Sequence, residues 1–335
     1  MQKNNTSSAA SAYADFTSAS GPVSIRMNND YLFRALLQRN NRVLKGLICS
    51  LLHLDSAQVR SVSIANPIEL GDAIFSKDFL LDIKVQLNDR IIINLEMQVI
   101  NEHNWPERSL SYLCRSFDNL EQAQNYIDVQ PCIQIGLLDF TLFPEYPEFF
   151  ATYQFLNTKN HTLYSDKLRL CVIDLTKISM ATEEDKAYHI DYWASLFKAA
   201  TWEEIKMLAQ KDEYIRDASN TIYHLSQEAK IRMQCEARED YYRRQGDLQL
   251  RQERSEAAIA EKDSIIAEQE SIIAEKDAAL AEKDLAIAEK DSALAEKDSA
   301  IAEKDLAIAE KNSALAALQA EIERLKYYYN DTHHS

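Results

Sequence analysis

The chain has 335 residues, of which 37 are basic and 53 acidic, and its formal net charge is −16. Five residues are glycine, and no two of them lie closer than 25 positions. This spacing excludes a glycine-rich loop that cradles a nucleotide phosphate and the G-x-S-x-G elbow of common serine hydrolases. We therefore expect no nucleotide cofactor. The acidity argues against a nucleic-acid partner only if it is spread evenly along the chain.

The five cysteines are scattered and include no C-x-x-C pair. They indicate neither a zinc ribbon nor a disulfide framework, and free thiols are typical of a reducing compartment. The N-terminus lacks the apolar stretch of a secretory signal, and no apolar run reaches the roughly 18 residues of a transmembrane helix. We expect a cytoplasmic protein with no membrane partner.

The first 24 residues are rich in serine, alanine, asparagine and threonine, which predicts a disordered leader over residues 1–24. Asp30 then stands where the N-cap of a helix over YLFRALLQ would lie. A second helix is expected over NRVLKGLICSLLHL, after a break near Asn40. Residues 26–60 contain six basic and two acidic residues, a net charge of +4. This segment either approaches a phosphate backbone or is an ordinary solvated helix surface.

The hydrophobic period changes after residue 61. Strands are predicted over SVSIANPIEL, FLLDIKVQL and RIIINLEMQVI, and a helix from Pro106 to about Gln124. Three more strands are expected in CIQIGLLDF, FATYQFLN and LRLCVIDLT. Strands on both sides of a crossover helix predict an α/β or α+β domain over residues 25–180. Residues 181–254 read as a further helical region.

From Ala260 the chain repeats every seven residues with the pattern AEKDSAI. The repeat contains good helix formers and one large apolar residue per heptad, whereas a strong coiled coil has two. Residues 255–326 hold nine basic and eighteen acidic residues, a net charge of −9. This heptad-repeat helix is either a solvated spacer or a stalk that forms a homo-oligomer. Residues 327–335 are expected to fray.

The two central strands carry polar side chains on one face. Alternate residues of a strand share a face, so Asp82 lies on the side of Lys84, and Glu96 lies on the side of Gln98. The loop length decides how these strands pair with each other.

A three-residue loop pairs Leu87 with Ile91 and therefore Asp82 with Glu96. A two-residue loop would pair Asp82 with Leu95 and mix polar with apolar faces. The hydrophobic pattern favours the three-residue loop, which brings the Cβ atoms of two acids to about 5 Å from each other. Such carboxylates repel each other unless they share a proton, have a counter-ion such as Lys84, or bind a divalent cation. A salt-bridged or solvated strand face is the alternative.

The run LLDIKVQLNDRIIINLEMQ resembles the active-site hairpin of PD-(D/E)xK nucleases, and more specifically of the Rpn recombination-promoting nucleases, often labelled transposases. NDYLFRALL is similar to the family's opening helix, WPERSLSYLCRSF to its Arg-x-x-x-Tyr helix, and PCIQIGLLDFTLF and LRLCVIDLTKI to its later strands. The resemblance covers about residues 26–255. It implies an α/β fold with a restriction-endonuclease-like core and a C-terminal helical region. The long heptad-repeat helix that the seven-residue repeat predicts would follow this region.

By this resemblance Asp82 and Glu96 would bind Mg²⁺ or Mn²⁺, and Gln98 takes the place of the superfamily's lysine. A glutamine amide can orient water, but it cannot titrate as a base or carry charge. Lys84 is either a catalytic group or a solvated strand lysine. Asp30 would supply a third metal-binding acid or would cap its helix.

Other residues are candidates for weaker roles. Glu69, before the hairpin, is a further candidate metal ligand. Arg108 and Tyr112 share a face of the crossover helix, where they either contact the scissile phosphate and brace the acids or form a packing pair. Arg34 and Arg42 are the other candidates for contact with the DNA backbone, a kind of contact that does not specify sequence.

The resemblance implies a Mg²⁺-dependent DNA endonuclease that hydrolyses phosphodiesters and promotes recombination, or that acts in mobile-element or phage-defence biology. The alternative is a catalytically inactive nuclease fold that serves as a DNA-binding or scaffolding module, with a self-associating tail.

Overall fold

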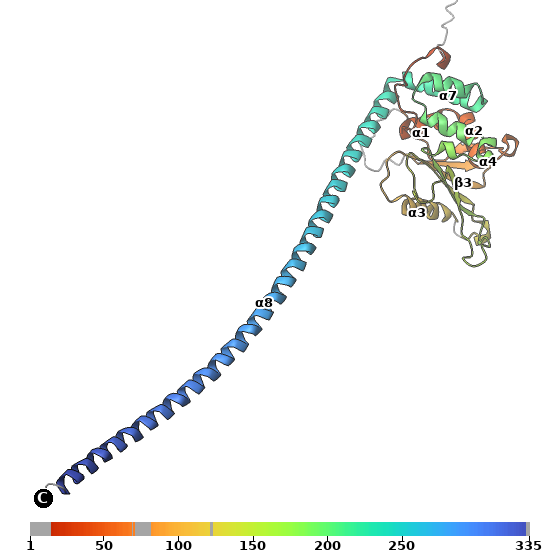
Figure 1. Cartoon of the computed structure of the whole chain (residues 1–335). Helices are drawn as coiled ribbons and strands as arrows, with labels where there is room; N and C mark the ends of the chain where they lie inside the picture. The colour runs from red at the N-terminus through yellow and green to blue at the C-terminus, as the bar shows by residue number, and fades with distance from the viewer. Residues whose placement is uncertain (1–14, 69, 71–81, 121–122, 333–335) are drawn as a thin grey trace, which may run out of the picture. The chain divides into compact units, whose positions relative to one another are not determined.

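The computed structural model describes residues 15–68, 70, 82–120 and 123–332 (Figure 1). The chain forms two compact units, Met1–Leu250 and Arg251–Ser335. The expected positions of Glu69 and of residues 1–14 of the leader lie outside the described residues.

One mixed sheet organises the first unit, with strand order β1-β2-β3-β4-β6-β5. Strands β1 to β3 pair antiparallel, β3, β4 and β6 run parallel, and β5 pairs antiparallel with β6 at the edge. The strands are β1 (Val62–Ile64), β2 (Ile83–Leu87), β3 (Ile91–Gln98), β4 (Cys132–Leu138), β5 (Phe150–Tyr153) and β6 (Leu168–Asp174). These ranges confirm the six predicted strands. The parallel strands β4 and β6 are almost fully buried, as expected for strands covered on both faces.

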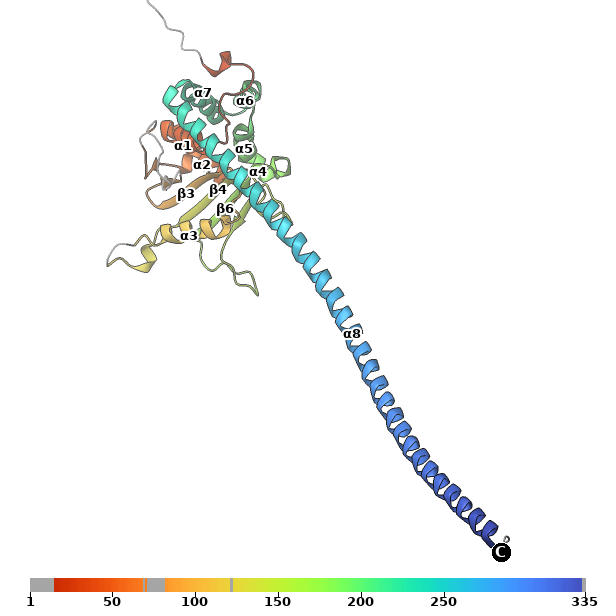
Figure 2. The same cartoon turned by 90° about the vertical axis from the view of Figure 1, so that its left-hand side faces the viewer.

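Helix α3 (Trp105–Phe117) is the crossover that makes β3 and β4 parallel, and it covers one face of the sheet (Figure 2). Its first residue, Trp105, packs with Ile92, Leu138 and Val172 of the sheet in a small core. The helix ends at Phe117 and does not reach the predicted Gln124. The chain turns there because the side-chain amide of Asn119 bonds the carbonyl groups of Ser116 (3.0 Å) and Gln130 (3.3 Å).

The other face of the sheet carries a second group of helices and the larger core. Figure 2 shows α1, α2, α5 and α7 on the side of the sheet opposite α3. The helices are α1 (Asp30–Arg39), α2 (Asn41–Leu51), α4 (Glu183–Ala187), α5 (Ile190–Lys198), α6 (Trp202–Ala209), α7 (Glu213–Gln227) and α8 (Ala229–Thr332). Short 3-10 turns are η1 (Phe16–Ser18), η2 (Ser56–Gln58), η3 (Tyr126–Asp128) and η4 (Ile178–Met180). The regions predicted as residues 25–180 and 181–254 thus share one core up to Leu250.

Two local predictions at the N-terminal side need correction. Residues 15–24 are ordered, because Phe16 is buried in the core and Val23 donates a hydrogen bond to the Ala200 carbonyl (2.9 Å). The N-cap of α1 is Asn29, whose side chain accepts hydrogen bonds from the backbone N–H groups of Tyr31 and Leu32. Asp30 is the first helical residue, and its carboxylate is free for another partner.

Helix α8 is 104 residues long and ends at Thr332. Throughout residues 255–326 every side chain is exposed. None of the helices in the described part of the chain is both long and apolar enough to cross a membrane. All five cysteines lie in the described residues and are free thiols.

Gly136 generates a prediction about stability. A Cβ atom there would lie 2.1 Å from the Trp105 ring, so the glycine is needed for α3 to approach the sheet. We expect Gly136→Ala to lower the free energy of unfolding by about 1–3 kcal/mol, measured by urea denaturation.

The matched control is Gly246→Ala, because nothing lies within 4 Å of that helical position. This substitution should raise the free energy of unfolding by roughly 0.5–1 kcal/mol. Equal unfolding midpoints for Gly136→Ala and the parent would contradict the packing described for Trp105.

Candidate active site

The β2–β3 hairpin has the predicted register. Leu87 pairs with Ile91 and Ile83 pairs with Leu95, which confirms the three-residue loop. The turn contains Asn88 and Asp89 with left-handed φ angles of 52° and 58°, a conformation that these side chains tolerate. Asp82 and Glu96 follow the last pair at the open end of the hairpin.

Hydrogen bonds to its backbone carbonyl fix Asp82 directly before the first residue of β2. Its carbonyl oxygen accepts hydrogen bonds from Nη1 of Arg34 (2.5 Å) and from Nδ2 of Asn66 (2.9 Å). The oxygen of the same Asn66 side chain accepts the N–H of Lys84 (2.8 Å). Burial raises the pKa of the Asp82 carboxyl, while the positive charges of Arg108 and Arg34 act in the opposite direction.

Glu96 is 4% exposed and lies where β3 meets β4 and α3. Its Oε1 accepts a hydrogen bond from Nη2 of Arg108 at 2.6 Å, and its Oε2 is buried without a hydrogen-bond partner. Burial, followed by the negative charge of Asp82, raises the pKa of Glu96 to about 8. Asp82 precedes Ile83 and Glu96 follows Leu95, so the register of the hairpin brings the two residues to neighbouring positions.

Asp30 reaches the same group from the start of α1. Its negative charge raises the pKa of both Asp82 and Glu96. Both of its carboxylate oxygens are bonded to Arg238 of α8, with Nε at 2.9 Å from Oδ1 and Nη2 on Oδ2. We call Asp30, Asp82 and Glu96 the acidic trio.

Arginines balance the charge of the acidic trio. Arg108 bonds Glu96, Arg238 bonds Asp30, and Arg34 acts on Asp82. Carboxylate oxygens are the ligands that Mg²⁺ and Mn²⁺ prefer, and the unpartnered Oε2 of Glu96 fits such an ion. Among the described residues, however, no three His, Cys, Asp or Glu side chains are arranged to hold a metal ion.

Gln98 and Lys84 lie on the polar face but contact other groups. The Gln98 side chain donates a hydrogen bond to the Ile100 carbonyl at 3.0 Å. The positive charge of Lys84 lowers the pKa of the Cys132 thiol, which burial raises to about 11. Cys132 pairs with Ile92, four residues before Glu96.

The four candidates for DNA contact have different environments. Arg34 is fully buried and bonds backbone carbonyl groups, so its guanidinium does not face a phosphate. Arg42 is half exposed but forms ion pairs with Glu213 (2.6 Å) and Asp217 (2.5 Å) of α7. Within the acidic trio, the Arg34 side chain bonds the backbone carbonyl of Asp82 and no carboxylate, and the Arg42 ion pairs involve none of its members.

The other two candidates, Arg108 and Tyr112, do reach the site. The Arg108 guanidinium lies 5.6 Å from the centre of the Tyr112 ring. Arg108 also contacts Glu102 at 3.6 Å besides its bond to Glu96. Burial raises the pKa of the Tyr112 hydroxyl, and so does the negative charge of Asp82. The i, i+4 spacing on α3 therefore places both side chains near the acids.

Arg238, Tyr242 and Asn66 are site residues that no local spacing predicts. Arg238 lies 208 positions from Asp30 in the sequence. The one available signal is the run REDYY, an arginine and two adjacent aromatic residues in an otherwise polar helix. Aromatic residues in such a helix indicate a face that is covered.

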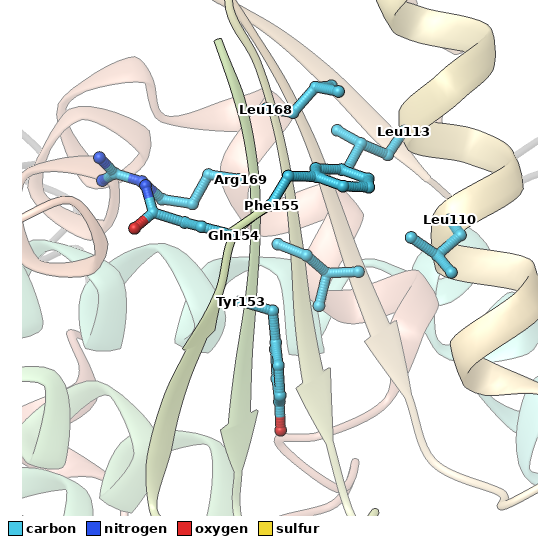
Figure 3. Close-up of a pocket in the computed structure, with 8 residues that line it drawn as sticks. Leu110, Leu113, Tyr153, Gln154, Phe155, Leu168 and Arg169 are labelled. Atoms are coloured by element: carbon cyan, nitrogen blue, oxygen red, sulfur yellow. The ribbon is translucent and has the colours of Figure 1, made fainter. Parts of the chain in front are cut away.

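Two cavities differ in their relation to these acids. A cavity of about 420 Å³ adjoins Asp30, because Tyr242 both lines it and accepts the N–H of Asp30 (3.2 Å). It is lined by Arg26, Val99, Ile100, Asp139, Glu239, Tyr242 and Arg243. A second cavity of about 180 Å³ lies between α3 and the β5–β6 edge (Figure 3). Its lining is mainly apolar. Neither cavity is lined by a member of the acidic trio, but the first is connected to Asp30 through Tyr242.

Comparison with known proteins agrees with this geometry. Residues 27–248 match a protein family described as "PD-(D/E)XK nuclease family transposase". The match contains the hairpin, α3 and the start of α8. Neither the search of curated proteins nor the search of solved structures gives a significant match.

The raised pKa of Glu96 predicts how stability depends on pH in metal-free protein. The folded state keeps a proton on Glu96 up to about pH 8, whereas the unfolded chain loses it near its ordinary value of 4.5. The free energy of unfolding should therefore fall as pH rises between these values. Between pH 5 and pH 8, the free energy of unfolding of the parent should fall by roughly 1–3 kcal/mol more than that of Glu96→Gln, whose side chain cannot titrate.

Urea denaturation in a chelator at pH 5, 6.5 and 8 measures this difference. Glu107→Gln, the same kind of change at an exposed position on α3, should keep the pH dependence of the parent. The same slope in Glu96→Gln as in the parent would show that Glu96 does not carry the buried proton.

Proposed function

The chain belongs to the PD-(D/E)XK nuclease family transposases, and from this premise we propose that it is a divalent-metal-dependent DNA endonuclease. The reaction would be hydrolysis of a backbone phosphodiester, with Mg²⁺ or Mn²⁺ as the cofactor. The breaks would promote recombination or serve a mobile element or phage defence. The observation that carries the proposal is the hairpin register, in which Asp82 and Glu96 lie next to the Ile83–Leu95 pair. One buried carboxylate oxygen of Glu96 has no hydrogen-bond partner.

The chain supplies oxygen ligands and their supports. Asp82 and Glu96 would hold the ion, with Asp30 as a third acid. A bound Mg²⁺ polarises a phosphoryl oxygen and lowers the pKa of water. Arg108 orients Glu96 through the 2.6 Å bond and lies about one helical turn after Trp105 on α3. Gln98 can orient a water or phosphate oxygen but cannot accept a proton as a base.

The surface that would meet the DNA backbone borders the larger cavity. Arg26 and Arg243 line it, with 58% and 72% of their side chains exposed. Each forms an exposed ion pair, with Glu239 and Asp240 respectively. Such pairs contribute little to stability, so a phosphate can replace the acid as partner. These contacts would position DNA without reading its sequence.

A specific observation also favours the alternative function, an inactive nuclease fold used as a DNA-binding or scaffolding module. The acidic trio is neutralised by arginines, and the described residues contain no group arranged to hold a metal ion. A site of this kind is stable without a cation. Metal binding and strand cleavage distinguish the two functions.

We also propose that the heptad region joins copies of the chain. Leu315, Leu318, Ile322 and Leu325 follow the i, i+3, i+7, i+10 spacing of a coiled-coil seam. Each of these side chains is more than half exposed on α8. Exposed apolar residues at this spacing favour a second copy of the same helix as their cover.

The cleavage prediction uses supercoiled plasmid with Mg²⁺ or Mn²⁺. Asp82→Asn and Glu96→Gln should each reduce the rate of nicking by at least about a hundredfold, because each removes a charged oxygen ligand. Glu107→Gln on α3 should nick at the parent rate. If the parent cleaves and both site variants cleave equally well, the assigned acids are wrong; an inert parent under varied metals favours the scaffold.

The association prediction uses sedimentation velocity of the full chain over a range of concentrations. The double substitution Leu318→Lys/Ile322→Lys should shift the oligomer to monomer, because it places charge in the seam. Ala320→Lys, on the opposite side of the helix, should leave the sedimentation coefficient unchanged. A parent that is monomeric at every concentration would contradict the proposal that the heptad region joins copies of the chain.

A further inference from the structure

The first turns of α8 pack against the start of α1 through several hydrogen bonds. The N–H of Asp30 bonds the Tyr242 hydroxyl at 3.2 Å, and the Asn29 side chain bonds the Cys235 carbonyl and Glu239, both at 3.1 Å. Asp30 and Tyr242 are 6% and 8% exposed. A contact of this density between distant segments fixes the position of the Asp30 side chain.

Arg238 is the centre of this contact. It forms a two-pronged bond with Asp30 through Nε (2.9 Å) and Nη2, a geometry in which a guanidinium matches both oxygens of a carboxylate. Its guanidinium carbon lies 4.7 Å and 5.2 Å from the ring centres of Tyr241 and Tyr242. The side chain is therefore held on both sides, by charge and by aromatic rings.

The bond with Arg238 engages both carboxylate oxygens of Asp30. Glu96 gives one oxygen to Arg108 and leaves the other free, whereas both oxygens of Asp30 are bound to Arg238. A divalent cation entering a site already neutralised by arginines gains less electrostatic energy than it would beside unpaired carboxylates. Of these two arginines, Arg238 is the one whose displacement would release a whole carboxylate.

We propose that Arg238 is a positioning residue that serves as the resident counter-ion of Asp30 and keeps this carboxylate out of the metal-ligand set until it is displaced. This inference rests on the proposed metal site. Asp30 then changes partner from guanidinium to cation, and no covalent bond forms or breaks. The start of α8 thereby sets the affinity of the site for a divalent ion.

The test measures Mn²⁺ binding to the full chain without DNA, by electron paramagnetic resonance of free Mn²⁺ at fixed pH and ionic strength. Arg238→Met keeps the length of the side chain and its contact with the tyrosine rings but removes the charge. It should bind Mn²⁺ about tenfold more tightly than the parent. Arg238→Lys, which keeps the charge without the fork, should lie between the two.

A double substitution separates positioning from a general loss of structure. Arg238→Met/Asp30→Asn should lose the gain and bind Mn²⁺ as Asp30→Asn does, because the gain requires the released carboxylate. Arg244→Met, an exposed change on the same helix, should bind like the parent. Thermal unfolding and circular dichroism establish that each variant is folded.

The outcomes distinguish this inference from the proposed function. In one outcome the parent binds Mn²⁺, Glu96→Gln abolishes binding, and Arg238→Met binds no more tightly than the parent. The metal site is then supported, and the role of Arg238 as a competing counter-ion is overturned. If Arg238→Met and Arg238→Lys both weaken binding, Arg238 supports the ligand set and the inference is overturned. If no folded variant binds Mn²⁺, the metal site fails and the inference fails with it.

Discussion

The burial of like charges at the open end of the β2–β3 hairpin is the constraint on which the rest of the site depends. Asp82 and Glu96 are brought together by strand register, away from water, so each requires a compensating positive charge or a bound proton. The compensation comes from helices on both faces of the sheet: Arg108 from α3, and Arg34 and Arg238 from α1 and α8. The helical layers are thus part of the electrostatics of the site as well as its cover.

The hairpin could be predicted because it depends on local rules. The period of two and the loop length together determine that Leu87 faces Ile91, and the positions of both acids follow. The crossover helix could be predicted equally well, since the i, i+4 spacing alone places Arg108 and Tyr112 on one face. The end of that helix could not be predicted, because it depends on a hydrogen bond from the Asn119 side chain to the Gln130 carbonyl, eleven residues further along the chain.

Contacts between distant segments explain what the sequence could not show. Arg34 belongs to a locally basic segment, yet it is buried because two carbonyl groups far along the chain accept its hydrogen bonds. Phe16 lies in a segment of disordered composition and is nevertheless a core residue. The partner of Asp30 is 208 positions away. None of these pairings has a periodic signal, because each arises only once the helices have packed.

The approach of Trp105 to Gly136 has a consequence for how relatives of this chain can diverge. The indole occupies the volume that any side chain at position 136 would fill, and Glu96 is paired with that same glycine across the sheet. A larger residue at 136 is compatible with the fold only beside a smaller one at 105. The two positions should therefore co-vary among homologous sequences, and a change in either would shift Arg108, three residues beyond Trp105, relative to Glu96.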